Sequence, residues 1–125
     1  MAADLKFAKT HEWIRPEADG LATVGVSAYA VEALTDLVFM QLPPVGKKVK
    51  AGESIGEIES VKAVSDLYAP VSGEIVEVNT ALPGRLETLG QDPYGAGWIV
   101  RIRPDAPAEM ENLMDQSAYE ALVKS

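Results

Sequence analysis

Lys62 stands in the sequence at a place where its amine could be acylated. The segment ESVKA, residues 59–63, puts it between Val61 and Ala63, after one alternating stretch of residues and before another. Attaching a cofactor to a lysine requires an exposed amine, a rigid hairpin that presents it, and small neighbours that leave a modifying enzyme room. Because acylation neutralises the ammonium group, the charge cannot be the purpose of such a site. The alternative at this point is a solvated turn lysine without a function.

The composition limits the chemistry that the chain can carry out by itself. The 125 residues include no cysteine, which removes disulfides, thiolate metal sites and a cysteine nucleophile together. Any redox chemistry must therefore come from a group attached to the chain. Eleven basic and nineteen acidic residues give a formal charge of −8, which repels phosphate backbones and anionic lipid surfaces. We therefore expect neither a nucleic acid nor a membrane as partner.

Short strands are predicted on both sides of Lys62. Residues 55–61 and 63–68 alternate between two faces, and glycine or proline separates them from their neighbours. Further strands are predicted at residues 21–26, 37–42, near 49, 74–78 and 98–103. Such short strands are unstable alone, so they should pair into a small barrel or sandwich. With 6% aromatic residues, its core must rest on Val, Ile, Leu and Ala.

Helices are predicted in two places outside this β core. Ser27 is a suitable N-cap for a helix of about two turns over residues 28–34, and one further helical turn is expected near residues 85–89. After Pro104 the period becomes helical, with Asp105 and Asp115 as expected caps of one broken helix or of two short helices. The expected apolar stripe consists of Met110, Leu113, Met114, Ser117, Ala118, Ala121 and Leu122. We expect one domain, residues 1–125, with its core at about 21–103 and a helical tail at about 105–123 packed on it.

Four stretches of the chain resemble the glycine cleavage H-protein family of lipoyl carriers. They are KTHEW at residues 9–13, VGVSAYAVEALTDLVFMQLPPVG at 24–46, AGESIGEIESVKAVSDLYAPVSGEIVEVN at 51–79 and DPYGAGWIVRI at 92–102. The resemblance covers nearly the whole chain in order. The segment ESVKAVSDLYAPVSGE is its most specific part, because related lipoyl domains resemble TDKA at this turn and biotin carriers resemble MKM.

The resemblance implies a fold and an attachment site. The fold would be a mainly β barrel-sandwich hybrid of the lipoyl and biotinyl attachment type, with a short helix in the N-terminal half and a C-terminal helical tail. Lys62 would form an amide with lipoic acid and become N6-lipoyllysine. Glu59, three residues earlier, and Gly73, eleven residues later, match positions that lipoylating enzymes of this family recognise. Without the resemblance, Glu59 is an ordinary strand carboxylate and Gly73 an ordinary turn residue.

The resemblance also implies a role and a set of partners. A PLP-dependent glycine decarboxylase (P protein) would pass the aminomethyl group of glycine to the carrier, and a tetrahydrofolate-dependent aminomethyltransferase (T protein) would take it onward. Dihydrolipoamide dehydrogenase (L protein) would reoxidise the dithiol, and a lipoylating enzyme would load Lys62. The carrier, a monomer, would catalyse nothing itself.

An acidic cleft for the loaded arm is the last implication of the resemblance. Glu12 and Asp66 match family positions near the parked arm, and Thr10 and His11 lie beside Glu12 in sequence. For Glu12 and Asp66 the alternatives are structural carboxylates. For His11 the favoured interpretation is that it seats the first strand together with Trp13, because a lone histidine does not make a metal site.

Other functions remain compatible with the sequence. An H-like lipoate donor that relays the group to other proteins could have the same residues around Lys62, and an unmodified interaction domain could keep the fold. A hydrolase that uses Glu12 and Asp66 is disfavoured, since no nucleophile motif such as G-x-S-x-G is present. The N-terminus has no apolar run of signal-peptide length, so we expect a cytoplasmic bacterial protein, or a mitochondrial matrix protein if it is a processed eukaryotic form.

Overall fold

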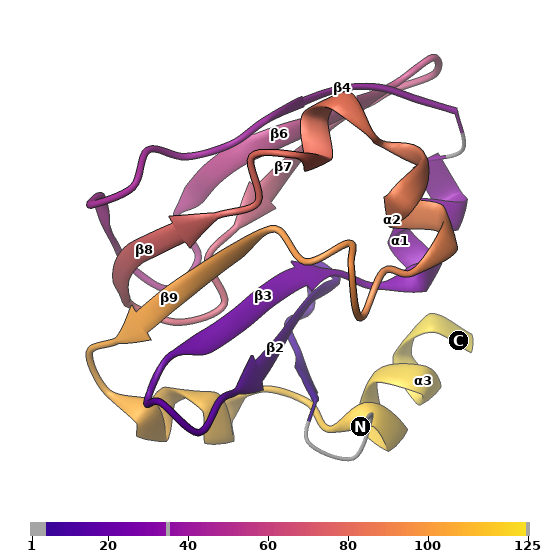
Figure 1. Ribbon diagram of the computed structural model, residues 1–125. Helices are drawn as coiled ribbons and strands as arrows, with labels where there is room; N and C mark the ends of the chain where they lie inside the picture. Colours follow the sequence, from indigo (N-terminus) through magenta and orange to yellow (C-terminus); the bar gives the residue numbers. More distant parts are fainter. Residues whose placement is uncertain (1–4, 35, 125) are drawn as a thin grey trace.

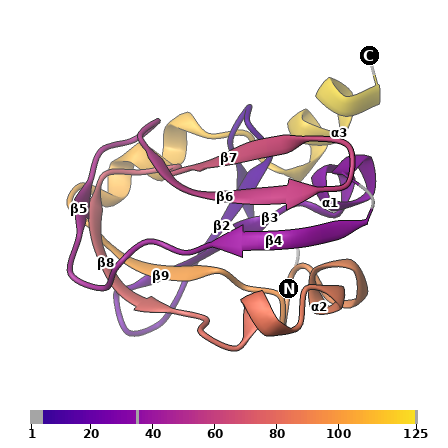
Figure 2. The ribbon, with the colours of Figure 1, turned by 90° about the horizontal axis from the view of Figure 1, so that it is seen from above.

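The computed structural model describes residues 5–34 and 36–124. The strands are β1 (Lys6–Phe7), β2 (Glu12–Pro16), β3 (Ala22–Val26), β4 (Leu37–Gln41), β5 (Lys48–Val49), β6 (Ser54–Ser60), β7 (Val64–Tyr68), β8 (Gly73–Val78) and β9 (Val100–Pro104). The helices are α1 (Ala28–Leu34), α2 (Glu87–Gln91) and α3 (Gln116–Lys124), with 3-10 turns η2 (Leu82–Gly84) and η3 (Pro107–Asn112). The strands form two antiparallel sheets with helices at the edges, which confirms the mainly β prediction (Figures 1 and 2).

The larger sheet has the strand order β1-β2-β3-β9-β8-β5. Its β2 strand contains Trp13 and Ile14, both fully buried. Trp13 lies opposite Gly25 of β3, where an added Cβ would be 2.7 Å from the indole ring. Only glycine leaves space for the indole against this strand. Buried core residues therefore occur before residue 21 as well as after it.

The smaller sheet has the order β4-β6-β7 and contains the predicted hairpin. Met40 pairs with Ile58, and both side chains are buried against the larger sheet. In the next pair along the strands, Gln41 and Glu57 point the other way. The sheet thus has one apolar and one solvated face, as is usual for antiparallel sheets.

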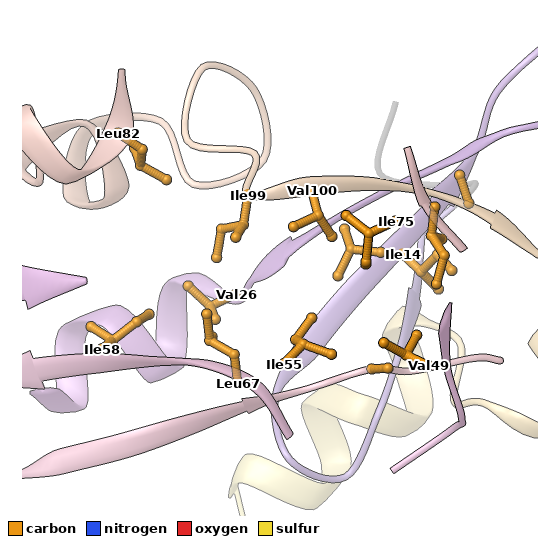
Figure 3. Close-up of a cluster of buried hydrophobic side chains, with 14 of the residues drawn as sticks. Ile14, Val26, Val49, Ile55, Ile58, Leu67, Ile75, Leu82, Ile99 and Val100 are labelled. Atoms are coloured by element: carbon orange, nitrogen blue, oxygen red, sulfur yellow. The ribbon is translucent and has the colours of Figure 1, made fainter. Parts of the chain in front are cut away.

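The apolar faces of the two sheets meet in a single cluster of buried side chains (Figure 3). The cluster is aliphatic, as the low aromatic content predicted. Each fully buried aliphatic side chain contributes about 1.5–3 kcal/mol relative to exposure. The side chains labelled in Figure 3 are Ile14, Val26, Val49, Ile55, Ile58, Leu67, Ile75, Leu82, Ile99 and Val100.

The C-terminal tail packs differently from the prediction. Tyr119 is buried and stacks on Phe7 of β1, with ring centroids 4.3 Å apart, whereas Leu122 is exposed. Of the predicted stripe, Ser117, Ala118, Ala121 and Leu122 face solvent. Met110 and Leu113 are partly buried against the cluster of Figure 3, and Met114 is partly buried against a second cluster formed by Leu5, Phe7, Trp13 and Tyr119. The prediction allowed one broken helix or two short ones but placed its stripe on a single helical period. The 3-10 turn η3 precedes α3 and shifts the register between them.

The predicted helix starts were partly correct. Ser27 Oγ accepts a hydrogen bond from Ala30 N (3.2 Å), and Asp115 Oδ1 accepts one from Ala118 N (2.9 Å), so both cap their helices. Asp105 is not a cap, since Ala106 precedes η3 and no side chain bonds there. The last strand begins at residue 100 instead of 98, because Trp98 N bonds to the carbonyl of Gly95 in the preceding turn.

No helix within residues 5–34 and 36–124 combines the length and apolar character needed to cross a lipid bilayer.

Candidate functional site

The turn that carries Lys62 is fixed by the side chain of Ser60. This buried hydroxyl accepts hydrogen bonds from Lys62 N (3.2 Å) and Ala63 N (3.1 Å), and Ser60 N donates to the Ala63 carbonyl (2.8 Å). Val61 N donates to the Asp36 carbonyl (3.0 Å), which ties the turn to the start of β4. We call residues 60–63 the lysine turn. All four of its backbone amides are hydrogen-bonded, so the turn is rigid without any contact to the Lys62 side chain.

Lys62 itself is exposed at one end of the molecule. The lysine turn lies at the end that also holds α1, opposite the end that holds β5 (Figure 2). Within the described part of the chain, no carboxylate pairs with the Lys62 amine. Glu59, the predicted recognition residue, lies next to the turn and faces Val64 across the hairpin. The amine is therefore accessible, and a carboxylate-bearing residue lies three positions before it, at the end of β6.

A hollow of about 310 Å³ lies beside β7 and α1. Its polar wall holds Glu12, the nearby Thr10 and His11, and Ser65 and Asp66 of β7. Its other lining residues are Val26, Tyr29, Ala30, Ala33, Leu34, Ile58 and Leu67. We call this the Glu12 hollow. The structure thus brings the two predicted carboxylates to the wall of a single cavity.

Glu12 is an unusual carboxylate because only 2% of its surface is exposed. Its Oε2 accepts a hydrogen bond from Tyr68 N (3.0 Å), and its Oε1 accepts one from the Thr10 hydroxyl. Loss of hydration raises the pKa of Glu12 to about 7, although both hydrogen bonds favour the charged form. The group is therefore balanced between its charged and neutral forms near neutral pH.

Asp66, in contrast, lies at the solvent-exposed rim of the hollow. Its Oδ2 accepts a hydrogen bond from the Tyr68 hydroxyl (3.3 Å). The Asp66 charge and this hydrogen bond raise the pKa of Tyr68. The hollow thus has one acidic group deep inside and one at its mouth.

The C-terminal helix supports the hollow from behind. The Tyr119 hydroxyl lies 2.7 Å from His11 Nδ1 and 2.6 Å from Ser27 Oγ, so one residue of α3 bonds to both the loop before β2 and the cap of α1. His11 has a left-handed backbone (φ 80°), and its carbonyl accepts a hydrogen bond from Ser27 N. Burial lowers the pKa of His11, which favours the neutral form of the imidazole.

These contacts give His11 the structural position that the sequence favoured, next to the strand that starts at Glu12. The contribution of Tyr119 was missed, since nothing in the sequence links residue 119 to residue 11. The role of Ser60 was also missed, although a serine that opens a tight turn is a known signal for side-chain bonding to the backbone. Among the described residues, no three His, Cys, Asp or Glu side chains converge as a metal site would require.

Gly73 is not near the lysine turn. It starts β8 in the larger sheet and pairs with Val49 of β5, at the other end of the molecule (Figure 2). A Cβ at this position would lie 2.3 Å from the Arg103 carbonyl oxygen. Close packing of β8 on β9 therefore accounts for a glycine here, whether or not an enzyme also recognises it.

A larger hollow, about 340 Å³, lies between α1 and α2 but has no buried polar side chain. Its lining residues are Val31, Asp36, Leu37, Leu86, Glu87 and Gly90. The Glu12 hollow is better suited to a charged group, because a buried carboxylate stabilises a cation more strongly than an exposed one does.

Comparison with known proteins decides the family. The family model described as "Glycine cleavage H-protein" matches residues 5–125. This chain belongs to the glycine cleavage H-protein family. A glycine cleavage system H protein of Idiomarina loihiensis is 53% identical over 121 residues, covering 97% of this chain and 94% of the relative. One of Escherichia coli is 53% identical over 122 residues, covering 98% and 95%.

A solved structure supports the family fold as well. The crystal structure of a glycine cleavage system H protein from Mycobacterium marinum superimposes with a TM-score of 0.88 at 50% identity and covers 98% of both chains. The predicted barrel-sandwich fold of this lipoyl-carrier family is thereby confirmed. In the described strands of this chain the two sheets remain open, with β4 and β7 at the edges of the smaller one.

Proposed function

We propose that this protein is a lipoyl carrier of the glycine cleavage system, with lipoic acid joined by an amide to the Lys62 amine. The observation that carries the proposal is the lysine turn, which presents an exposed amine on a backbone fixed by Ser60. Membership in the H-protein family supports the same site. When attached, the dithiolane supplies the sulfur chemistry, acceptance of the aminomethyl group of glycine and of electrons, that a chain without cysteine lacks.

The Glu12 hollow lies within reach of an arm on Lys62. Ser65 and Asp66, at the hollow, follow Lys62 by three and four residues, which corresponds to about 10–13 Å along a strand. A lipoyl-lysine arm extends about 14 Å from the Lys62 Cα, estimated from ordinary bond lengths. The arm can therefore fold back along β7 into the hollow, where the side chains of Ile58 and Leu67 match its alkyl chain.

The two carboxylates would hold an amine cargo at the end of this arm. An ammonium group near Glu12 favours the charged form of its carboxyl, which lowers its pKa from about 7 and draws the pair together. Asp66 adds a second negative charge at the mouth of the hollow. The walls also shield the cargo from water, because α1 and β7 cover it on two sides. Glu12 and Asp66 thus act as binding groups and not as catalysts.

The partners follow from this role. The carrier would dock in turn on glycine decarboxylase (P protein), aminomethyltransferase (T protein) and dihydrolipoamide dehydrogenase (L protein), and a lipoylating enzyme would recognise Glu59 beside the turn. It acts as a monomer and catalyses no step by itself. The relatives named above come from bacteria, which supports a cytoplasmic location.

Glycine–bicarbonate exchange tests the proposal. In a reconstituted assay with glycine decarboxylase, lipoylated wild-type protein should support exchange, and Lys62→Arg should support none although it folds normally. Lys50→Arg is the matched control, because Lys50 is also exposed and lies in a loop away from the turn. Exchange that persists in the Lys62→Arg protein would contradict the carrier role of this lysine.

A further inference from the structure

Exposed apolar side chains gather around the lysine turn. Seven large apolar side chains are exposed among the described residues, and four of them, Val38, Phe39, Val61 and Val64, lie in β4, in β7 or in the turn between β6 and β7. Val61, next to Lys62, is 71% exposed. Single exposed apolar residues are scattered over most protein surfaces and need no explanation, whereas a contiguous group of them marks an interaction surface.

Three of the side chains at this end form a continuous row across the smaller sheet. Phe39 faces Glu59, and Glu59 faces Val64. Because the neighbouring pair Met40 and Ile58 points inward, this row points outward into solvent. We call Phe39, Glu59 and Val64 the hairpin row. An acidic side chain thus stands between two apolar ones on the face beside Lys62.

The charge of the hairpin row has no ion-pair partner among residues 5–34 and 36–124. In the described part of the chain, no Lys or Arg forms an ion pair with Glu59 or with Glu57, which lies on the same strand and face. Asp66 pairs with Glu57 across the hairpin and adds to the negative charge. The complement of this surface is therefore a cationic side chain flanked by apolar groups.

The length of the unmodified lysine indicates which partner covers the row. The Lys62 amine reaches only about 6 Å from its Cα, so an enzyme that acylates it must bring its active site against the turn. An enzyme that uses the loaded arm can act from about 14 Å away. Close contact with the lysine turn is thus required in the loading step, and the hairpin row adjoins this turn, because Glu59 and Val64 flank it on β6 and β7.

We propose that the hairpin row is the docking surface of the lipoylating enzyme, with Phe39 and Val64 as apolar contacts on either side of Glu59. The inference rests on the proposed function, since it assumes that Lys62 is the loading site. It adds that recognition reaches across the hairpin to β4, a strand more than twenty residues before the lysine in sequence. The enzyme would present a cationic side chain to Glu59 and apolar side chains to its two neighbours.

Kinetics of lipoylation test this surface. The rate of lipoyl transfer by a lipoate–protein ligase with lipoic acid and ATP would be followed by intact mass for Phe39→Thr, Val64→Ser and the double variant. We expect kcat/KM to fall about tenfold in the double variant, mainly through KM, because two interface anchors are lost. Val45→Ser is the matched control, since Val45 is 60% exposed and Val64 61%, yet Val45 lies outside the hairpin. Thermal unfolding should be similar in all variants, because every change is at the surface.

The outcomes separate the inference from the proposed function. A double variant that is loaded as fast as Val45→Ser would overturn the inference and leave the carrier role intact. After exhaustive loading with excess ligase, the double variant should support normal glycine–bicarbonate exchange. An equal loss in exchange would assign the row to the decarboxylase and overturn the proposed occupant. A wild-type protein that takes up no lipoate would remove the proposed function itself.

Discussion

The lysine turn and the Glu12 hollow do different work and are built in different ways. The lysine turn is formed by consecutive residues, and apart from the bond from Val61 N to the Asp36 carbonyl its hydrogen bonds involve the side chain and backbone of Ser60. The Glu12 hollow is assembled from three distant parts of the chain: residues 10–12, the end of β3 with α1, and the hairpin of β6 and β7. It is supported by Tyr119 from the C-terminal helix. Presenting an amine requires local rigidity, whereas sheltering a charge requires tertiary burial.

The comparison predicts that the two regions respond differently to pH, with the largest effect at Glu12. Burial raises the pKa of Glu12 from 4.5 to about 7. The folded protein therefore binds more protons than the unfolded chain within this window, so its stability falls as pH rises from 4.5 to 7. The stability that protonated Glu12 contributes is fully present below its pKa of 4.5 in the unfolded chain and is lost above its pKa of about 7 in the folded protein. Integrated over the window, the loss is about 3 kcal/mol.

The Glu12→Gln variant should not show this loss of folding stability, because its amide side chain does not titrate. Urea unfolding of the unmodified protein at several pH values should show wild type losing stability relative to Glu12→Gln between pH 4.5 and 7. Glu57→Gln, a carboxylate outside the hollow, should follow the wild-type curve. Parallel curves for wild type and Glu12→Gln would mean that burial of Glu12 does not perturb its ionisation, and the contrast between the two regions would disappear.

The lysine turn should be weakened by removing one hydroxyl. Ser60→Ala takes away the acceptor of Lys62 N and Ala63 N, so we expect a loss of about 1–2 kcal/mol in the free energy of unfolding and slower lipoylation from a less rigid turn. Ser65→Ala is the control, since Ser65 is exposed and bonds only weakly, at 3.5 Å, to the Asp66 carbonyl. Equal behaviour of the two variants in thermal unfolding and in lipoylation would show that Ser60 does not fix the turn.

The smallest expected effect is at the mouth of the hollow. In protein loaded with the aminomethyl group, Asp66→Ala should shorten the lifetime of the bound cargo by about two- to fivefold, because exposed charge pairs contribute little more than about 1 kcal/mol. Glu57→Ala, which removes the carboxylate opposite Asp66 on β6, should leave the lifetime unchanged. The release of ammonia and formaldehyde over time would measure it. An unchanged lifetime in Asp66→Ala would exclude this residue from cargo binding.

The sequence predicts the two regions unequally, for a physical reason. Alternation and turn residues located β6, β7 and the lysine turn within one or two residues, because these signals are local. Ser27 and Asp115 were likewise recognisable as helix caps from their side-chain types. The resemblance to a known family pointed to Glu12 and Asp66, and the structure places both at one hollow.

Contacts between distant segments could not be predicted in this way. The bond from Tyr119 to His11 joins residues 108 positions apart, and the burial of Glu12 depends on strands and helices from three parts of the chain. The stripe predicted for the tail failed because a 3-10 turn interrupts the helical period. The requirement for glycine at position 73 comes from the close approach of β8 to the Arg103 carbonyl of β9, and no local sequence signal indicates this contact.

Peptide mass spectrometry tests the central claim, that Lys62 is the attachment site, most directly. The protein would be produced with lipoic acid and a lipoylating enzyme, and a known carrier would be treated alongside it. We predict that the peptide containing Lys62 carries the mass of one lipoyl group and that peptides with other lysines carry none. An unmodified Lys62, in the presence of a modified control carrier, would contradict the claim and leave only a shared fold.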